Sequence, residues 1–455
     1  MMGQLVSRGH ELTPHPEEAE VLVVNTCSFI DPAKKESVDT ILEMAEYKKT
    51  GRARKLIVAG CLVERYRADI RKDLPEVDAL VGTNELERIV GLVEGWSDDA
   101  GGAAPTPYLY HDLTPRVLAT PRHYAYIKIA EGCDHPCTFC VIPQYRGGFR
   151  SRRFESVVAE ATRLFQQGVR EINLIGQDTT CFGEDLGIRD GLAALLGRLA
   201  EIETPRAKWV RFLYAYPNKV TQRLLDTIAA HDALVKYIDM PLQHASGAVL
   251  KRMKRGASGD IFLKLIERVR RTIPGVAIRT SFIVGFPGET GRDFDELCAF
   301  VQAARFDRLG VFSYSDEDTS ASYRLAGKVD GRTIYNRKRR LMALQRAISR
   351  ARNRKLVGQE APVLVEGLSQ ETDLLWQGRL ATQAPEIDGV TLINDVEGDA
   401  PAPGQIRMLR VTEAHDYDVV GTLLAASEGE RSPMPAQPLV MISPAPGALP
   451  RAAGL

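Results

Sequence analysis

The first part of the chain alternates short apolar runs with amphipathic stretches. Residues 21–24, 55–59 and 78–81 are rich in β-branched and other apolar residues, a pattern typical of buried strands. Residues 33–48, between the first two runs, have the periodicity of a helix. Because strands alternate with helices, residues 1–96 are predicted to form an α/β domain with a doubly wound parallel sheet.

The same alternation returns with a longer period over residues 119–355. Strands are predicted to begin near Tyr124, Glu171, Trp209, Val235, Val276 and Asp307, and helices at 155–167, 219–230, 259–272 and 292–304. These units predict a partial or complete TIM-like α/β barrel, whose chemistry should lie at the carboxyl ends of the strands. Residues 97–118, which begin with small, polar, Gly- and Pro-rich sequence, predict a linker between the two domains.

The last part of the chain changes character. Short strands broken by Gly, Pro and Asp predict a small OB-like β-barrel over residues 356–424. From residue 359 to 424 there are three Arg and no Lys against twelve Asp and Glu. The helix predicted at 331–355 carries ten Lys and Arg and no acid. It would meet RNA or lie against the acidic barrel, and a solvated helix face is the alternative. Residues 425–455 are rich in Pro and Ala and predict a disordered tail.

Composition and charge exclude several classes of protein. The chain has 59 Lys and Arg against 59 Asp and Glu, which excludes a uniformly basic nucleic-acid binder. No apolar stretch is long enough to span a membrane, and the first residues lack the apolar core of a signal peptide. We therefore expect a cytoplasmic protein with no membrane partner. Seven cysteines in such a chain favour metal binding or catalysis over disulfides.

The strongest chemical signal is a group of three cysteines directly after the first predicted strand of the barrel. Cys133, Cys137 and Cys140 have the spacing C-x3-C-x2-C. Three thiolates this close can ligate three irons of a cubane iron–sulfur cluster and leave the fourth iron open, as a catalytic metal site requires. A zinc site is the less favoured alternative, because His135 sits too tightly between two cysteines to serve as the fourth ligand.

Two further cysteines have matched surroundings. Cys27 and Cys61 each follow the carboxyl end of a predicted parallel strand, where open α/β sheets build their sites. Buried structural thiols are the alternative for either one alone. Cys181 and Cys298 have no partner at a ligand spacing, and Cys298 lies in a helical pattern that predicts packing.

The C-x3-C-x2-C motif resembles that of the radical S-adenosylmethionine enzymes. The resemblance implies that the open iron chelates S-adenosylmethionine and that an electron from the cluster cleaves it to a 5′-deoxyadenosyl radical. Phe139, before the third cysteine, fits the aromatic position near the adenine, with a place in the core as the alternative. Strand-end residues complete the predicted cofactor site: Gly176, Gln177, Gly285 and Glu289. His244, at another strand end, is either a site residue or a structural histidine.

The segments Asn-Thr-Cys27-Ser-Phe and Ala-Gly-Cys61, followed by the radical motif and a terminal TRAM barrel, resemble the methylthiotransferase family over about residues 1–424. The resemblance implies a second 4Fe-4S cluster held by three cysteines of the N-terminal domain. Only Cys27 and Cys61 are available, and the first strand with its Gly-Cys ligand is missing. We therefore expect a misassigned start codon, and in this chain an incompletely ligated second cluster.

Two substrate classes compete within that family. One subgroup modifies adenosine in tRNA, and the other modifies an aspartate of small-subunit ribosomal protein S twelve. An acidic barrel suits a basic ribosomal protein better than a polyanion. Three segments also resemble the second subgroup specifically: 374–379, 383–389 and 413–421.

The sequence thus predicts a ribosomal-protein aspartate methylthiotransferase. The resemblance implies a reaction in two halves. One S-adenosylmethionine methylates a sulfur at the second cluster. The radical from another abstracts a hydrogen atom from the aspartate β-carbon, and the methylthio group is transferred there. An external electron donor is implied, and the partner is the ribosomal protein or the small subunit. Arg146, Arg150, Arg152 and Arg153, after the cluster motif, would hold a carboxylate or a phosphate, and a solvated basic loop is the alternative. A non-enzymatic iron–sulfur module that binds RNA or the ribosome is the alternative outside the family.

Overall fold

The N-terminal domain is a parallel three-stranded sheet covered by helices on both faces. In the computed structural model, which describes residues 1–95 and 108–430, its strands pair in the order β1-β2-β3. The elements are α1 (Met2–Ser7), β1 (Val21–Thr26), α2 (Asp31–Thr50), β2 (Lys55–Gly60), α3 (Cys61–Asp73), β3 (Ala79–Val81) and α4 (Ile89–Val93). On β2, Leu56 and Val58 pack toward α2 and α3, whereas Ile57 and Ala59 pack toward α1 and α4. The predicted doubly wound sheet is confirmed.

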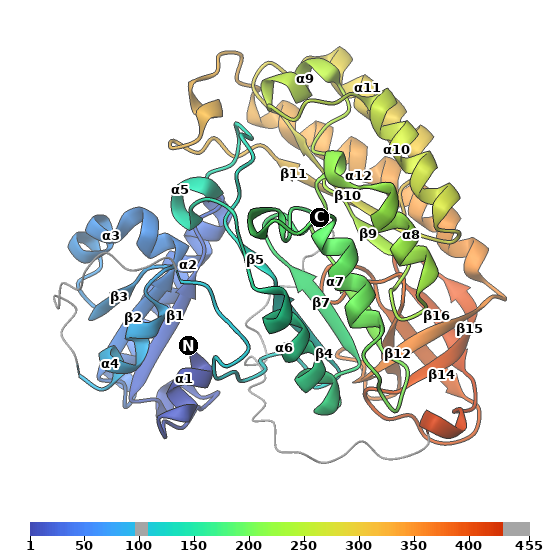
Figure 1. Ribbon diagram of the computed structural model, residues 1–455. Helices are drawn as coiled ribbons and strands as arrows, with labels where there is room; N and C mark the ends of the chain where they lie inside the picture. The colour runs from blue at the N-terminus through green and yellow to red at the C-terminus, as the bar shows by residue number, and fades with distance from the viewer. Residues whose placement is uncertain (96–107, 431–455) are drawn as a thin grey trace.

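The central domain follows the predicted β/α order (Figure 1). Its strands are β4 (Tyr124–Lys128), β5 (Ala130–Glu131), β6 (Arg150–Ser151), β7 (Glu171–Ile175), β8 (Trp209–Phe212), β9 (Tyr237–Asp239), β10 (Ala277–Val284) and β11 (Arg308–Ser313). Its helices are α5 (Ile142–Arg146), α6 (Phe154–Gln166), α7 (Gly191–Ala200), α8 (Gln222–Ala230), α9 (Gly247–Arg252), α10 (Gly259–Thr272), α11 (Gly291–Ala304) and α12 (Gly331–Asn353).

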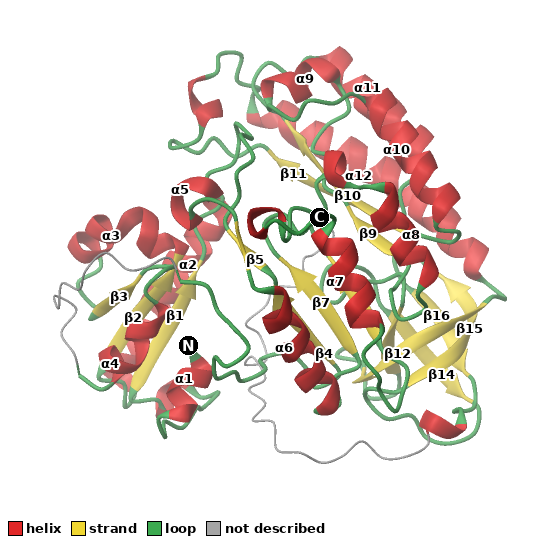
Figure 2. Ribbon diagram, viewed as in Figure 1, coloured by secondary structure: helices red, strands yellow, loops and turns green. Residues whose placement is uncertain are grey.

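The long strands of this domain form a partial barrel. One parallel sheet has the order β4-β7-β8 and another has β11-β10-β9, and a parallel bridge between Val210 and Leu234 joins them. Within the described ranges no pairing joins β4 to β11, so the barrel is open on that side. Figure 2 shows the helices outside the strands. On β7, Ile172 and Leu174 point to these helices and join the largest apolar core, which leaves the alternate residues facing inward.

The basic helix α12 packs along the edge of the central domain. Leu341 and Ile348 are buried in the large core, and most of the cations face solvent. At its carboxyl end, Arg350 Nε lies 2.5 Å from Asp416 Oδ1 of the C-terminal domain. Of the two partners predicted for this helix, the acidic barrel is therefore in contact with its last turns.

The C-terminal domain is a closed five-stranded barrel with the order β12-β13-β14-β16-β15. Its strands are β12 (Glu360–Leu368), β13 (Trp376–Leu380), β14 (Thr391–Val396), β15 (Ile406–Ala414) and β16 (Val419–Leu423). Inward-facing apolar residues such as Val363, Leu409 and Val411 fill it. The predicted small β-barrel is confirmed.

Two predicted loose segments are packed where the structure describes them. Residues 96–107 and 431–455 lie outside the described residues. In the second half of the predicted linker, the Tyr110 hydroxyl donates to Glu160 Oε1 of α6 at 2.7 Å. At the start of the predicted tail, the buried Glu430 pairs with Arg170. Residues 108–118 and 425–430 therefore bury side chains against the central domain, and the bounds of the linker and the tail stay predictions.

A buried ion network joins the C-terminal barrel to the amino-terminal ends of the central strands. Arg379 of β13 contacts Glu171 Oε2 of β7 and Glu366 Oε1 of β12, each at 2.6 Å. Arg211 contacts the other oxygen of Glu171 at 2.9 Å. Burial alone would raise the pKa of Glu366, but the Arg379 guanidinium outweighs it and lowers that pKa to about 2. Removal of one partner would therefore leave a buried charge in this network without a counter-ion.

The first prediction concerns this network. Arg379→Met should destabilise the chain, because two buried carboxylates lose a partner; such a loss typically costs about 3–5 kcal/mol. The free energy of unfolding in urea measures it. Arg410 pairs with Glu360 at 3.0 Å on the surface, so Arg410→Met is the matched control and should cost at most about 1 kcal/mol. Equal losses in the two variants would contradict a special role for the buried network.

Candidate active site

The loop that carries the three closely spaced cysteines is closed at its base by the hairpin of β5 and β6. Gly132, the first residue after β5, has a φ of +79°. A Cβ atom there would lie 2.1 Å from the carbonyl oxygen of Gly148. Only glycine fits such a close approach of two backbone segments. The hairpin therefore presents the loop at the carboxyl end of β4, where the sequence predicted the chemistry.

The three thiols of this loop are partly buried. The N–H of Cys140 donates to the carbonyl oxygen of Cys137 at 3.1 Å. Burial raises the pKa of Cys133 to about 11 and that of Cys140 to about 12, and neighbouring thiols contribute to both shifts. Cationic irons would favour the thiolate forms instead. This donor set of three sulfur atoms on one loop fits an iron–sulfur cluster.

A stack of aromatic and cationic side chains borders the loop. The ring of His135 stacks on Tyr216 with centroids 3.8 Å apart, and the Arg255 guanidinium lies 4.2 Å from the same tyrosine ring. Arg255 Nη1 is 3.6 Å from Cys137 Sγ. His135 Nε2 is 2.6 Å from Asp178 Oδ2. His135 is thus engaged by groups other than the three thiols, in agreement with its exclusion as their fourth metal ligand.

The carboxylate of Asp178, shortly after β7, accepts several hydrogen bonds. Cys181 Sγ lies 3.1 Å from Asp178 Oδ2, and the backbone N–H of Thr180 donates to Oδ1 at 2.8 Å. Burial opposes ionisation of Asp178, but the hydrogen bonds from His135, Thr180 and Cys181 lower its pKa. The candidate ligand atoms of His135, Asp178 and Cys181 lie within 4.8 Å of one another, and the hydrogen bonds among them account for that spacing.

The sequence predictions did not assign roles to Asp178, Tyr216 or Arg255. Asp178 and Tyr216 lie a few residues after the ends of β7 and β8, so their positions near carboxyl strand ends were the available signal. Arg255 follows a helix instead, and nothing in its sequence surroundings indicates that it reaches a cysteine.

The predicted cofactor residues near the loop have different surroundings. Phe139 packs beside Met253 and Phe286 in a small apolar cluster. Gly176 directly follows β7, and a Cβ there would be 3.7 Å from Ala130, an ordinary contact. Gln177 has a buried Oε1 atom that receives no hydrogen bond within the described part of the chain. An S-adenosylmethionine contact stays a prediction for all three, and Gln177 has the free acceptor such a contact would use.

Gly285 and Glu289 have structural partners at the end of β10. A Cβ on Gly285, whose φ is +84°, would lie 2.3 Å from Ile334 of α12. Glu289 Oε2 accepts from the N–H groups of Gly285 and Phe286, and its Oε1 lies 3.1 Å from Arg337 Nη1 of α12. These contacts fasten α12 to the turn after β10. A cofactor contact stays a prediction for Gly285 and Glu289.

The second cysteine group lies at the ends of β1 and β2. Cys61 begins α3 and Cys27 follows β1, with Cys27 exposed and Cys61 partly buried. The Ser28 hydroxyl donates to the carbonyl oxygen of Cys61 at 3.0 Å, which holds the two loops together. Burial raises the pKa of the Cys61 thiol, and nearby Cys27 adds to the shift. The predicted placement at adjacent strand ends is what the structure shows.

Arg146 connects the two cysteine groups. It ends α5 on the cluster loop, and its Nη2 lies 3.2 Å from Cys61 Sγ of the N-terminal domain. Its Nη1 donates to Glu131 Oε1 at 2.9 Å, two residues before Cys133. Glu131 also accepts from Lys128. Figure 1 shows α5 beside the N-terminal domain. One guanidinium therefore spans the distance between the thiol of one domain and the loop of the other.

Cys298 and His244 both lie in buried positions. Cys298 is buried in the core on α11. His244 is buried after β9, where its Nδ1 accepts from the Ser246 N–H at 3.0 Å. Burial lowers the pKa of His244 to about 3, which keeps the ring neutral.

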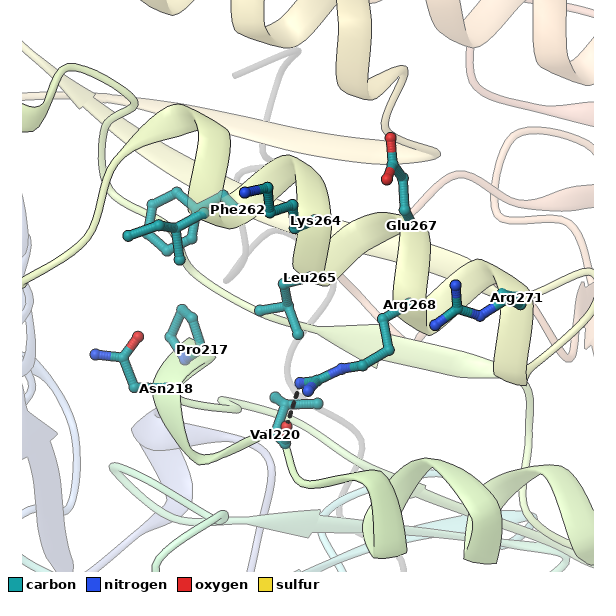
Figure 3. A pocket seen from close by; sticks show the side chains of 10 residues that line it. Pro217, Asn218, Val220, Phe262, Lys264, Leu265, Glu267, Arg268 and Arg271 are labelled. Atoms are coloured by element: carbon teal, nitrogen blue, oxygen red, sulfur yellow. Dashed lines mark hydrogen bonds between the residues drawn. The ribbon is translucent and has the colours of Figure 1, made fainter.

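A pocket on the outer side of the barrel is separate from these groups. Figure 3 shows it between the Pro217–Lys219 turn and α10, with Arg268 donating to the carbonyl oxygen of Val220 at 2.8 Å. No cysteine lines this pocket.

The chain is similar to known proteins over its whole described length. Residues 1–82 match the uncharacterized protein family UPF0004, residues 127–301 the Radical SAM superfamily, and residues 357–424 the TRAM domain. A protein of Solibacter usitatus (strain Ellin6076) called ribosomal protein uS12 methylthiotransferase RimO is 81% identical over 428 residues, 94% of this chain and 92% of that protein. The chain belongs to this methylthiotransferase family. The predicted resemblance is confirmed.

Other comparisons agree with family membership. A Koribacter versatilis (strain Ellin345) protein of the same name is 57% identical over 93% of each chain. The solved radical S-adenosylmethionine methyltransferase TsrM from Kitasatospora setae is 17% identical and covers 65% of this chain and 62% of its own, with a TM-score of 0.50. The latter similarity shows the shared fold. As a member of the family, the chain is an enzyme that uses an iron–sulfur cluster and S-adenosylmethionine.

The second prediction tests the base of the cluster loop. Gly132→Ala should lower both the iron bound after anaerobic reconstitution and the melting temperature, because strained positions cost about 1–3 kcal/mol each. Gly291→Ala is the matched control, since a Cβ there has no neighbour within 4 Å. Wild-type iron content and stability in Gly132→Ala would show that the loop does not need this close approach.

Proposed function

We propose that this enzyme transfers a methylthio group to the β-carbon of an aspartate in ribosomal protein uS12, as the names of its relatives indicate for those proteins. The observation that carries the proposal is the Arg146 contact, which brings a thiol of the N-terminal domain beside the three-cysteine loop. Methylthio transfer needs a radical source and a sulfur carrier at one substrate, and two adjacent cysteine groups provide places for both.

In this proposal Cys133, Cys137 and Cys140 hold the first 4Fe-4S cluster. Bound there, the cluster and S-adenosylmethionine supply the radical that removes a hydrogen atom from the substrate. The chain orients these groups. Arg255 places a cation beside Cys137, and the stack of His135 on Tyr216 covers one side of the loop. Electrons come from an external donor.

Cys27 and Cys61 would hold the second 4Fe-4S cluster through two thiolates. The Arg146 cation would stabilise the thiolate of Cys61, and the hydrogen bond from Ser28 keeps the two strand-end loops next to each other. A 4Fe-4S cubane is normally held by four cysteine thiolates, or by three where one iron stays open. A two-cysteine site would therefore hold its cluster less firmly than the radical loop holds the first.

The surface of the C-terminal barrel favours a basic protein as substrate. Two of its three arginines, Arg379 and Arg407, are buried, which leaves Arg410 as the exposed one. Its exposed acids are more numerous: Glu360, Glu371, Asp373, Glu386, Asp395, Glu397, Asp399 and Glu413. Such a surface attracts a Lys- and Arg-rich ribosomal protein and repels nucleic acid. A tRNA adenosine substrate and a non-enzymatic RNA-binding role are therefore disfavoured.

The third prediction separates the two cysteine groups. Replacing Cys133 with Ala should abolish formation of 5′-deoxyadenosine, because the radical cluster loses a ligand. The double change Cys27→Ala/Cys61→Ala should keep that reaction and about four irons per chain while losing methylthio transfer. Chromatography of 5′-deoxyadenosine, iron counting and mass spectrometry of uS12 give the three readouts. Normal 5′-deoxyadenosine formation in a Cys133/Cys137/Cys140 triple Ala variant would refute the assignment.

The fourth prediction concerns recognition. Binding of uS12 should weaken as salt rises, because exposed charges separated by more than a Debye length of about 10 Å at 0.1 M salt are screened. Reversing Asp395 and Glu413 to Lys should weaken it further at low salt. Titrations of the full chain with uS12 and with tRNA measure this, and tighter binding of tRNA would refute the choice of substrate.

A further inference from the structure

One segment after the last barrel strand contacts both cysteine loops. We name residues 314–325 the bridging segment. On one side, the N–H of Ser322 donates to the carbonyl oxygen of Thr138 at 2.8 Å. Thr138 lies between Cys137 and Cys140, so this bond reaches the middle of the radical loop.

On the other side, Glu317 reaches the N-terminal domain. Its Oε2 lies 2.8 Å from Arg65 Nη1 of α3 and 2.8 Å from Lys34 Nζ of α2. Arg65 Nη1 also donates to the carbonyl oxygen of Ser28 at 3.0 Å, and Ser28 follows Cys27 directly. The Glu317 side chain is therefore linked to the second cysteine group through one residue, Arg65.

The bridging segment is held in shape by its own bonds. The Tyr314 hydroxyl donates to Ser322 Oγ at 2.8 Å, and the N–H of Ser320 donates to the carbonyl oxygen of Glu317 at 2.9 Å. Ser315 Oγ donates to Glu317 Oε1 at 2.7 Å. Ser320 and Ser322 are buried. A displacement of Glu317 would thus be passed to Ser322 and so to the radical loop.

The ion contacts of Glu317 are shielded from water. The side chains of Glu317 and Arg65 are 2% and 1% exposed, and that of Lys34 is 20% exposed. Arg65 also lies over the ring of Tyr145 on α5, at 5.6 Å from its centre. Buried pairs of this kind lose far more than surface pairs when one partner is removed.

We propose that Glu317 is a positioning residue that sets the relative placement of the two cysteine groups for methylthio transfer. The inference rests on the proposed function, because placement matters only if both groups act on one substrate. Glu317 acts through Arg65 and Ser322 and contacts no cysteine. Each domain has a separate apolar core, so loss of the contact displaces one domain relative to the other and leaves both folded.

The fifth prediction tests this role with Glu317→Gln. The yield of methylthiolated uS12 per 5′-deoxyadenosine formed should fall about 100-fold, since a misplacement near 1 Å can cost that much, while 5′-deoxyadenosine formation continues. Hydrogen exchange in the metal-free chain should quicken in residues 28–34 and 314–325. Lys34→Met, which removes one of two cations, should give an intermediate effect, and Glu317→Asp should recover part of the yield.

Asp39→Asn is the matched control, because Asp39 pairs with Lys35 on the exposed side of α2. It should change neither yield nor exchange. An unchanged product ratio in Glu317→Gln, or equal effects in the Asn and Gln variants, would overturn the proposal. If the wild type gives no methylthiolated uS12, the proposed function fails. Hydrogen exchange then tests the positioning role of Glu317 separately. Faster exchange in Glu317→Gln but not in the control variant supports that role, and unchanged exchange overturns it.

Discussion

Both α/β domains carry their cysteines at the carboxyl ends of parallel strands, so these two edges have to face each other for the groups to meet. Parallel sheets place every strand end of one direction at the same edge, which confines each cysteine group to one side of its domain. The interface must therefore form between two edges made of loops. Arg146 and Glu317 lie in that interface. Arg146 reaches the thiol of Cys61, and Glu317 reaches the side chains of Arg65 and Lys34.

Charged contacts suit this interface because of their direction and their environment. Apolar packing holds surfaces together without specifying a register, whereas a guanidinium with fixed donors accepts few arrangements. Arg65 of the N-terminal domain and Arg379 of the terminal barrel use this property, and each reaches a carboxylate of the central domain, Glu317 and Glu171 respectively. Both are buried, so their partners cannot be exchanged for water without loss.

The domain order and the first cysteine group were predictable from the sequence. Hydrophobic runs of the right length located β1, β2, β4 and β7, and the C-x3-C-x2-C spacing places its thiols in one loop whatever surrounds it. The packing of residues 108–118 and 425–430 could not be predicted, because polar and small residues resemble loops in a sequence until a distant partner such as Glu160 or Arg170 engages them. Gly285 shows the same limit, since the space beside it is filled by Ile334 from a helix far along the chain.

By itself, the sequence determined what is local: the strand and helix periods, the spacing of three thiols and the acidic composition of the terminal barrel. These depend on residues within a few positions of one another, so the order of residues carries them completely. Only the tertiary structure decided that Arg146 spans two domains, that Asp178 bonds to His135, and that Glu317 pairs with Arg65. Each of these contacts pairs residues that are tens to hundreds of positions apart. Their geometry arises from the packing of whole sheets, which no local pattern encodes.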